Sequence, residues 1–287
     1  MALALLRVVA AAAATALLLA APTVSATGVL LPLYVYPSII YGDGAARWQP
    51  ALAAVAATPG VPWLVVVNPG DGPGATGAPG NGDSNYMSGV AQLNLHANVQ
   101  TLGYVRTDYG AAPAAELRAN ITSWAGWASW AAADIGVQGI FFDEASARNT
   151  DFDYLSSAVA FARTAFGARQ IVTVCNFGAA ADVSFYDICD VVVAFESALD
   201  DPADPAYEST ATIVANTPDA GYRDQAAVIV HDFVGAAADG READAALLRS
   251  YIQDARDAEL GWLYFCSAGY DSITTAPATV GALAAAF

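Results

Sequence analysis

The sequence predicts an α/β protein, a single (β/α)8 TIM barrel with a short fifth helix. Eight apolar, strand-like runs follow one another along the chain, most of them starting about 35 residues after the last, with alanine-rich helical segments between them. The chain beyond residue 26 has roughly 260 residues, a usual length for this barrel. The units share no repeated residues, which argues against a solenoid, and no linker divides them. We therefore expect one barrel domain over residues 27–287.

Each predicted strand has an apolar body and ends near a polar or aromatic residue. The strands are expected over residues 29–36, 63–68, 101–107, 139–143, 170–176, 191–196, 227–232 and 262–267. Helices are expected between the strands, for example over 45–57, 113–132, 152–166 and 242–258, with Pro113 in a first helical turn and Gly167 as a helix stop. The fifth and sixth strands follow each other closely, so the helix between them should be a stub over 181–187.

The first 26 residues have the pattern of a secretory signal peptide. Arg7 precedes an apolar run over residues 8–19, and Val24-Ser25-Ala26 resembles a cleavage site before Thr27. A membrane anchor is the alternative, but the apolar run is short for a bilayer span. We expect a secreted, extracellular or cell-surface protein that has no membrane partner after cleavage.

Charge and cysteine content exclude several classes of partner. The net charge is −17, and all the basic residues are arginine, so neither nucleic acid nor anionic membrane is expected to bind. Three cysteines are too few for a disulfide scaffold; one bridge is possible, with Cys175–Cys189 preferred and Cys266 left over. We expect a monomer.

Two adjacent carboxylates end the fourth predicted strand, in the stretch Gly139-Ile140-Phe141-Phe142-Asp143-Glu144. Ligands of parallel α/β folds bind at the carboxyl ends of the strands. Neighbouring like charges resist ionising together, which suits acid–base chemistry. The alternative is that Asp143 or Glu144 caps the following helix.

Polar groups at other strand ends should share the mouth of the barrel with these acids. Glu196 ends the sixth strand in the same manner and can face Asp143 and Glu144 across the mouth, and two facing carboxylates are the equipment for cleaving a glycosidic bond. Alternatively, Glu196 forms a salt bridge with Arg106 that only holds loops. The expected substrate-binding residues are Tyr36, Asn68, Arg106, Tyr109, Asn176, His231, Asp232 and Tyr270.

Other chemistries find less support, and we expect neither a metal nor a cofactor. His96 and His231 are far apart in sequence for a zinc site, and no Gly-x-Ser-x-Gly motif is present. The acidic segment 200–204 lacks a full calcium-loop pattern. The glycine-rich segment 68–83 has no phosphate-loop ending; it is either a mobile loop beside the mouth or a plain connection.

Several motifs, in order from Gly28 to Glu196, resemble the spherulation-specific (spherulin-4-like) family. They are Leu31-Pro32-Leu33-Tyr34-Val35-Tyr36-Pro37, Val67-Asn68-Pro69, Asp83-Ser84-Asn85-Tyr86, Leu102-Gly103-Tyr104-Val105-Arg106-Thr107 and Gly139-Ile140-Phe141-Phe142-Asp143-Glu144. The resemblance implies a (β/α)8 glycoside hydrolase acting on α-1,4-linked galactosamine polymers.

The same resemblance implies roles for the three acids. Asp143 would be the nucleophile, Glu196 the acid/base and Glu144 a supporting acid. Because a neighbouring negative charge disfavours ionisation, we expect the pKa of Glu196 to be raised. The two catalytic carboxyl groups should then lie about 5–5.5 Å apart, the spacing of retaining enzymes. An acidic cleft would suit a cationic, partly deacetylated galactosaminogalactan. The alternative function is a non-catalytic surface or matrix protein that binds polysaccharide in the same groove.

Overall fold

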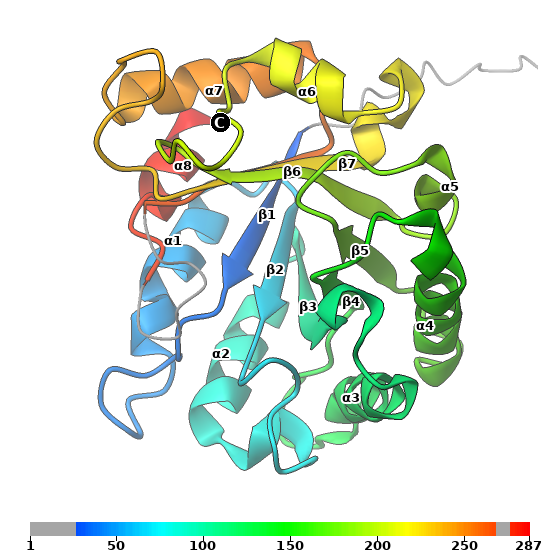
Figure 1. The fold of residues 1–287 in the computed structure, drawn as a ribbon. Helices are drawn as coiled ribbons and strands as arrows, with labels where there is room; N and C mark the ends of the chain where they lie inside the picture. The colour runs from blue at the N-terminus through cyan, green and yellow to red at the C-terminus, as the bar shows by residue number, and fades with distance from the viewer. Residues whose placement is uncertain (1–26, 268–275) are drawn as a thin grey trace, which may run out of the picture.

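The structure, a computed structural model, describes residues 27–267 and 276–287, and the expected signal peptide 1–26 lies outside them. In the described chain, parallel strands pair in sequence order and close into a barrel, with Gly28 and Val29 of the first strand against Trp262 and Leu263 of the last (Figure 1). The predicted fold is confirmed. The strands are β1 (Gly28–Leu33), β2 (Trp63–Val67), β3 (Val99–Arg106), β4 (Gly139–Asp143), β5 (Val172–Asn176), β6 (Val191–Ala198), β7 (Ala226–His231) and β8 (Trp262–Phe265).

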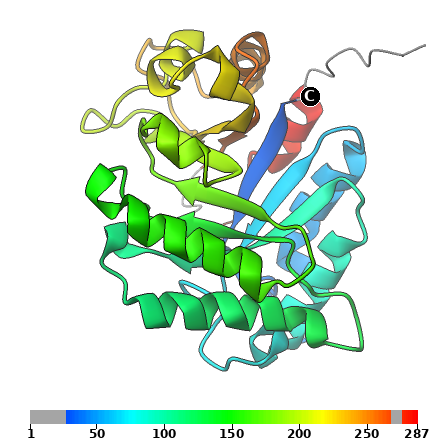
Figure 2. The same cartoon turned by 90° about the vertical axis from the view of Figure 1, so that its right-hand side faces the viewer.

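Helices surround the barrel. They are α1 (Gln49–Ala57), α2 (Ser84–Asn94), α3 (Ala114–Gly126), α4 (Phe152–Ala165), α5 (Val183–Tyr186), α6 (Thr210–Asn216), α7 (Ala245–Asp257) and α8 (Val280–Ala286). Figure 2 shows α3 and α4 lying side by side along the outside of the sheet. The short fifth helix is confirmed. Helices α2, α6 and α8 occupy intervals between or after strands for which no helix bounds were predicted from the sequence. The helix expected over 113–132 ends earlier, at Gly126, and Pro113 caps it rather than opening its first turn.

Packing of α3 on β3 sets one wall of the barrel. Trp124 and Trp127 are fully buried, while Trp130 is 39% exposed. The indole of Trp124 lies against Gly103, where a side chain would collide with it, and its Nε1 donates a 2.8 Å hydrogen bond to the carbonyl oxygen of Tyr104. Helix α3 therefore positions the strand segment that carries Tyr104.

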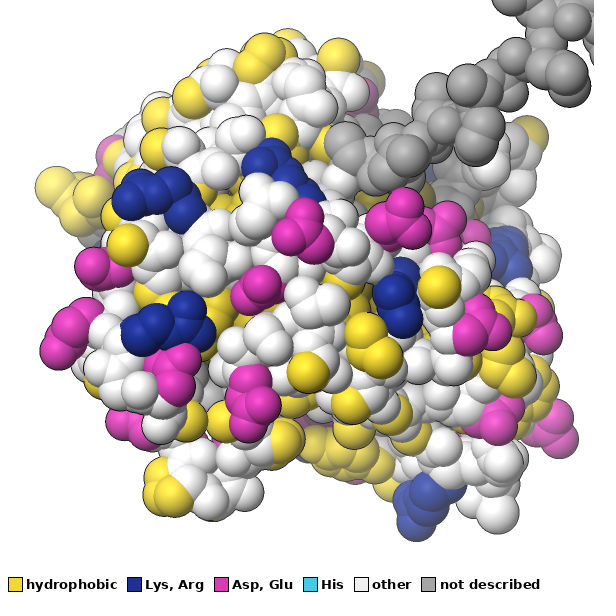
Figure 3. Space-filling view, turned by 90° about the horizontal axis from the view of Figure 1, so that it is seen from above, with side chains coloured by type: hydrophobic (Ala, Val, Ile, Leu, Met, Phe, Trp, Pro, Cys, Tyr) yellow, Lys and Arg dark blue, Asp and Glu magenta, His cyan; other side chains and the backbone are white. Residues whose placement is uncertain are grey.

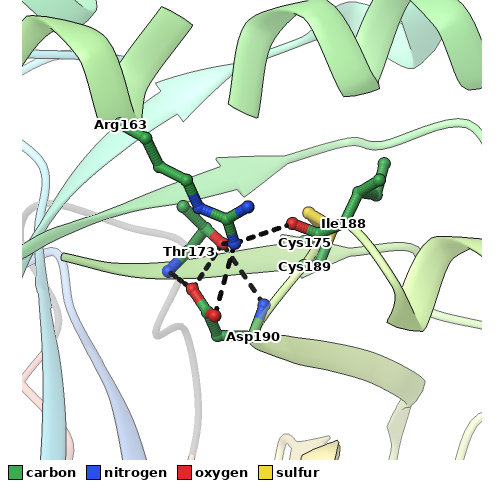
Figure 4. Close-up of a disulfide and its surroundings, with 6 residues drawn as sticks. All are labelled: Arg163, Thr173, Cys175, Ile188, Cys189 and Asp190. Atoms are coloured by element: carbon green, nitrogen blue, oxygen red, sulfur yellow. Dashed lines mark hydrogen bonds and ion pairs between the residues drawn. A yellow bond between two sulfur atoms is a disulfide. The ribbon is translucent and has the colours of Figure 1, made fainter. Parts of the chain in front are cut away.

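A disulfide joins the end of β5 to the start of β6. Cys175 and Cys189 form the predicted bridge, and Cys266 is a buried thiol. Beside the bridge, Asp190 accepts hydrogen bonds from the backbone nitrogen and the hydroxyl of Thr173 at 2.8 and 2.7 Å (Figure 4). Arg163 of α4 reaches the same carboxylate at 3.3 Å. The disulfide and these polar contacts thus hold β5, which ends at Asn176, against β6, which carries Glu196.

The surface offers no extended positive field on the side seen in Figure 3. There, arginine and acidic side chains are interspersed among uncharged and hydrophobic ones. Among the described residues, no helix is long and apolar enough to cross a membrane, and no three His, Cys, Asp or Glu side chains are grouped as they would be to hold a metal ion.

Candidate active site

One amide nitrogen lies between the two carboxylates that the sequence singled out. Nδ2 of Asn176 donates hydrogen bonds to Oδ1 of Asp143 at 2.7 Å and to Oε2 of Glu196 at 2.6 Å. These two oxygens therefore lie at most about 5.3 Å apart, the sum of the hydrogen-bond lengths of 2.7 and 2.6 Å. The last residues of β4 and β5 thus meet a side chain of β6 at the carboxyl end of the barrel.

A β-bulge decides the direction in which Glu196 points. Asn176 and Val193 are opposite each other in the pairing of β5 with β6, so their side chains lie on the same face of the sheet. The register of β6 against β7 then shifts by one residue between Val193 and Phe195. Without this shift, strict alternation would turn Glu196 to the opposite face from Asn176. The extra residue, Ala194, returns Glu196 to the face of the site.

Asp143 is enclosed by hydrogen-bond donors. Besides the bond from Asn176 to its Oδ1, it accepts a 2.7 Å hydrogen bond at Oδ2 from the hydroxyl of Tyr104. Burial raises the pKa of Asp143, although these two donors act in the opposite direction. A raised pKa on one acid of the Asp143–Glu144 pair agrees with the expectation that neighbouring carboxylates resist ionising together, and its main cause is that Asp143 is withdrawn from water at the end of β4.

Tyr104 was not among the predicted site residues. It lies two positions before the polar end of β3, so it was counted with the apolar strand body, and only 4% of its surface is exposed. Burial and the neighbouring carboxylate of Asp143 raise the pKa of its hydroxyl, which therefore stays a donor. Side-chain alternation in the sequence could have indicated its role, because Tyr104 and Arg106 are two residues apart and so point to the same side of the strand.

Glu144 forms an ion pair with Arg106. Nε of Arg106 contacts Oε2 of Glu144 at 2.7 Å, and its Nη2 contacts Oδ1 of Asp108 at 3.1 Å. The salt bridge considered for Glu196 is thus made by Glu144. Glu144 has a left-handed backbone, with φ of 51°, and its carbonyl oxygen accepts hydrogen bonds from the hydroxyl of Thr107 at 2.7 Å and the backbone nitrogen of Tyr109 at 2.7 Å. Such strained positions concentrate at functional sites.

A pocket of about 200 Å³ opens over these carboxylates. Tyr109, whose surface is 60% exposed, stands at its edge. Phe177 and Gly178, which follow β5 directly, were not predicted to take part. The lining residues are Tyr109, Asp143, Glu144, Asn176, Phe177, Gly178 and Glu196.

The other predicted substrate-binding residues that the structure describes are not among the lining residues of this pocket. Tyr36 donates to Asp83 at 2.8 Å, which ties the loop after β1 to the start of α2. Asn68 accepts hydrogen bonds from the backbone nitrogens of Gly70 and Gly72 and so shapes its own loop. His231 and Asp232 contact each other at 2.7 Å at the end of β7. Tyr270 lies outside the described residues.

Arg106, the ion-pair partner of Glu144, lines a second cavity of about 210 Å³. Three of the residues around that cavity are acidic, and Arg106 supplies a positive charge. Its lining comprises Asp71, Arg106, Asp108, Ala112, Pro113, Glu116 and Asn120. The carboxylates on this side of the mouth therefore outnumber the cations.

Fold and site together define a (β/α)8 barrel protein with two facing carboxylates at the carboxyl end of the strands. A family model described as "Spherulation-specific family 4" matches residues 28–286. The chain belongs to this family, as its motifs indicated.

Two known proteins are similar to it. Spherulin-4 of Physarum polycephalum is 32% identical over 169 residues, which are 59% of this chain and 44% of that protein, so the match spans less than half of the relative's length. The crystal structure of Aspergillus clavatus Sph3 in complex with GalNAc has a TM-score of 0.74 and 24% identity, over 91% of this chain and 97% of that one. At this level of identity the likeness shows a shared barrel fold.

Proposed function

We propose that this protein is a glycoside hydrolase that cleaves a galactosamine-containing polysaccharide and retains the configuration at the anomeric carbon. The observation that carries the proposal is the single nitrogen of Asn176 between Asp143 and Glu196. It keeps two carboxylate oxygens no more than about 5.3 Å apart, below the roughly 6.5–9.5 Å separation of inverting glycosidases, which supports the retaining mechanism.

In this proposal Asp143 is the nucleophile and Glu196 the acid/base. Both oxygens of Asp143 accept hydrogen bonds, from Asn176 and Tyr104, which suits its ionised form. An oxygen of Asp143 attacks the anomeric carbon, the glycosidic bond breaks, and Glu196 gives its proton to the leaving oxygen. In the second step Glu196 removes a proton from water, whose oxygen attacks the anomeric carbon and displaces Asp143.

Glu144 supports the site through Arg106. The ion pair holds the backbone that leads from Asp143 into the following loop, and the carbonyl of Glu144 is fixed by Thr107 and Tyr109. Its carboxylate still lines the pocket, where it can accept a hydrogen bond from a sugar hydroxyl or amine. Glu144 therefore contributes to substrate binding more than to proton transfer.

The nature of the sugar follows from similarity and charge. The GalNAc bound to Sph3, a protein of the same fold, supports an N-acetylgalactosamine unit in the pocket. The excess of carboxylates around Arg106 favours a chain that carries free, protonated amines, as in a partly deacetylated galactosamine polymer. The second cavity beside the pocket gives space for neighbouring sugars, which suits an endo-acting enzyme.

Location and assembly are part of the proposal. The Cys175–Cys189 bridge suits an oxidising compartment, as expected for a protein secreted by means of residues 1–26. The barrel buries its own core, and we propose that it acts as a monomer in the extracellular space or at the cell surface.

Product analysis tests the enzyme against the binding-protein alternative. The purified protein would be incubated with partly deacetylated galactosaminogalactan and, as a control polymer, with chitin, and the released oligosaccharides would be measured by mass spectrometry. We expect oligosaccharides from the first polymer, and none with Asp143→Asn or Glu196→Gln, because an amide keeps the shape of the side chain but transfers no proton. Binding of the polymer without release by the unaltered protein would support a non-catalytic matrix protein instead.

A further inference from the structure

Asn176 has the contacts of a bridge between two catalytic groups. Its side-chain nitrogen donates to Asp143 and to Glu196, so both amide hydrogens are used on carboxylates. Only 7% of Asn176 is exposed, although it lies beneath an open pocket. Two short hydrogen bonds to charged acceptors are worth more than neutral ones, particularly away from water.

The orientation of this amide is determined by its other end. Oδ1 of Asn176 accepts a 3.0 Å hydrogen bond from the backbone nitrogen of Gly178, and its main-chain oxygen accepts one of 2.8 Å from Ala145. A flipped amide would direct its oxygen at two carboxylates and its NH2 group at another donor. The NH2 group is therefore held towards the acids.

From this geometry we infer that Asn176 is a positioning residue of the proposed reaction: it sets the separation of Asp143 and Glu196 and stabilises the ionised form of each. The sequence had suggested a contact with substrate. The amide fills the gap between the carboxylates, so their mutual repulsion is offset by two donated hydrogen bonds. The kinetic part of the inference rests on the proposed function; the effect on ionisation does not.

Several charged or titratable groups face this bridge and act on the same carboxylates. Of the two carboxylates, the hydroxyl of Tyr104 donates a hydrogen bond to Asp143. Tyr104→Phe is therefore a matched control, because it removes a donor from Asp143 and leaves the hydrogen bond of Glu196 with Asn176 in place. Arg106 is engaged by Glu144 and Asp108. Around the bridge lie Tyr104 on β3, Tyr109 after it, Asp143 and Glu144 at the end of β4, and Glu196 on β6. Arg106 acts through its ion pair with Glu144, while Asp71 and Asp108 lie around the second cavity.

Two substitutions at Asn176 distinguish the hydrogen bonds that its amide donates to the two carboxylates from the one that it accepts from Gly178. Asn176→Asp keeps an oxygen for the nitrogen of Gly178 and removes both donated hydrogens, whereas Asn176→Ala removes the whole amide. Loss of a donor favours the protonated form of each carboxyl, so both limbs of the bell-shaped pH profile of kcat/KM should move to higher pH. We expect kcat to fall about 100-fold with KM little changed, the cost typical of losing one preorganised donor. Tyr104→Phe should move the acid limb only.

The decisive measurement follows the carboxyl groups themselves. Carbon-13 NMR of protein labelled at the aspartate side-chain carboxyl would be recorded across pH, with the Asp143 signal assigned by its absence in Asp143→Asn. The midpoint for Asp143 should rise in Asn176→Ala and in Asn176→Asp. This readout is meaningful even if the unaltered protein hydrolyses nothing, in which case the proposed function fails and the bridge stands. An unchanged titration midpoint of Asp143 in both variants would overturn the inference. So would a kcat/KM within about threefold of the unaltered value in both variants, if the limbs of their pH profiles do not move.

Discussion

The hydroxyl of Tyr104 donates a 2.7 Å hydrogen bond to Oδ2 of Asp143, from inside the barrel and opposite Asn176. Tyr104 is itself braced: its ring meets Tyr34 edge-on at 5.4 Å and stacks on Phe141 at 6.2 Å. The proposed nucleophile is therefore oriented by a tyrosine that packs among aromatic side chains from β3, from β4 and from the residue after β1, as a preorganised site requires.

Tyr104→Phe should reduce turnover while the barrel stays folded. The ring and its packing remain, and only the donor to Asp143 is lost, so we expect kcat to fall roughly 10- to 100-fold at neutral pH. Steady-state kinetics on a defined oligosaccharide would measure the loss, and thermal unfolding would confirm the fold. Unaltered turnover would mean that Tyr104 only fills space.

Asp143→Asn should stabilise the protein at neutral pH although it abolishes activity. Burial raises the pKa of Asp143 in the folded state, so this group favours folding below its unfolded pKa, and that contribution is lost as pH rises through the higher folded pKa. The uncharged amide avoids this loss. We expect a higher Tm than that of the unaltered protein at pH 7 and little difference at about pH 3, below the usual pKa of an aspartate near 3.9. A lower Tm for the variant at pH 7 would contradict this sign.

The first product should be the α-anomer. Two displacements on an α-linked substrate, the first by Asp143, restore the original configuration. Proton NMR recorded before mutarotation would identify the anomer. A β-anomer appearing first would remove Asp143 from the role of nucleophile.

Glu144→Gln should weaken substrate binding more than chemistry. The amide keeps a hydrogen-bonding group in the pocket but loses the charge that pairs with Arg106, which is half exposed. We expect KM to rise several-fold with kcat reduced less than in Glu196→Gln, and little loss of stability, because an exposed ion pair contributes on the order of 1 kcal/mol or less. A loss of kcat equal to that of Glu196→Gln would make Glu144 a catalytic acid.

Breaking the disulfide should lower stability and loosen the site. Cys175 and Cys189 close a loop with a sequence separation of 14, for which chain entropy suggests a contribution of about 3 kcal/mol to the free energy of unfolding. Denaturant unfolding of the Cys175→Ala, Cys189→Ala double variant would measure it. Adding reductant to that variant is the control, since it should change nothing further. Because Cys175 precedes Asn176 directly, we also expect lower kcat.

The barrel and the position of its site could be predicted because their signals are local. Apolar runs of strand length and their spacing follow from side-chain alternation and from the length of a strand–helix unit. Asp143, Asn176 and Glu196 ended predicted strands, and parallel strands bring their carboxyl ends to one edge. The bounds of helices α2 and α6 could not be given because these helices hold polar, β-branched and glycine residues, which are weak helix formers. Packing and capping by Asp83 and Ser209 nevertheless stabilise both helices.

The sequence by itself therefore determined the family, the fold and the strand ends at which carboxylates gather, and it favoured the disulfide that the structure contains. Tertiary structure decided how those groups meet. The bulge at Ala194 turns Glu196 towards the site, the ion pair draws Glu144 to Arg106, and Asn176 spans the gap. These three contacts depend on the strand register and on side chains from different strands. A register shift of one residue turns every side chain of a strand to the opposite face, and no local sequence pattern encodes the register.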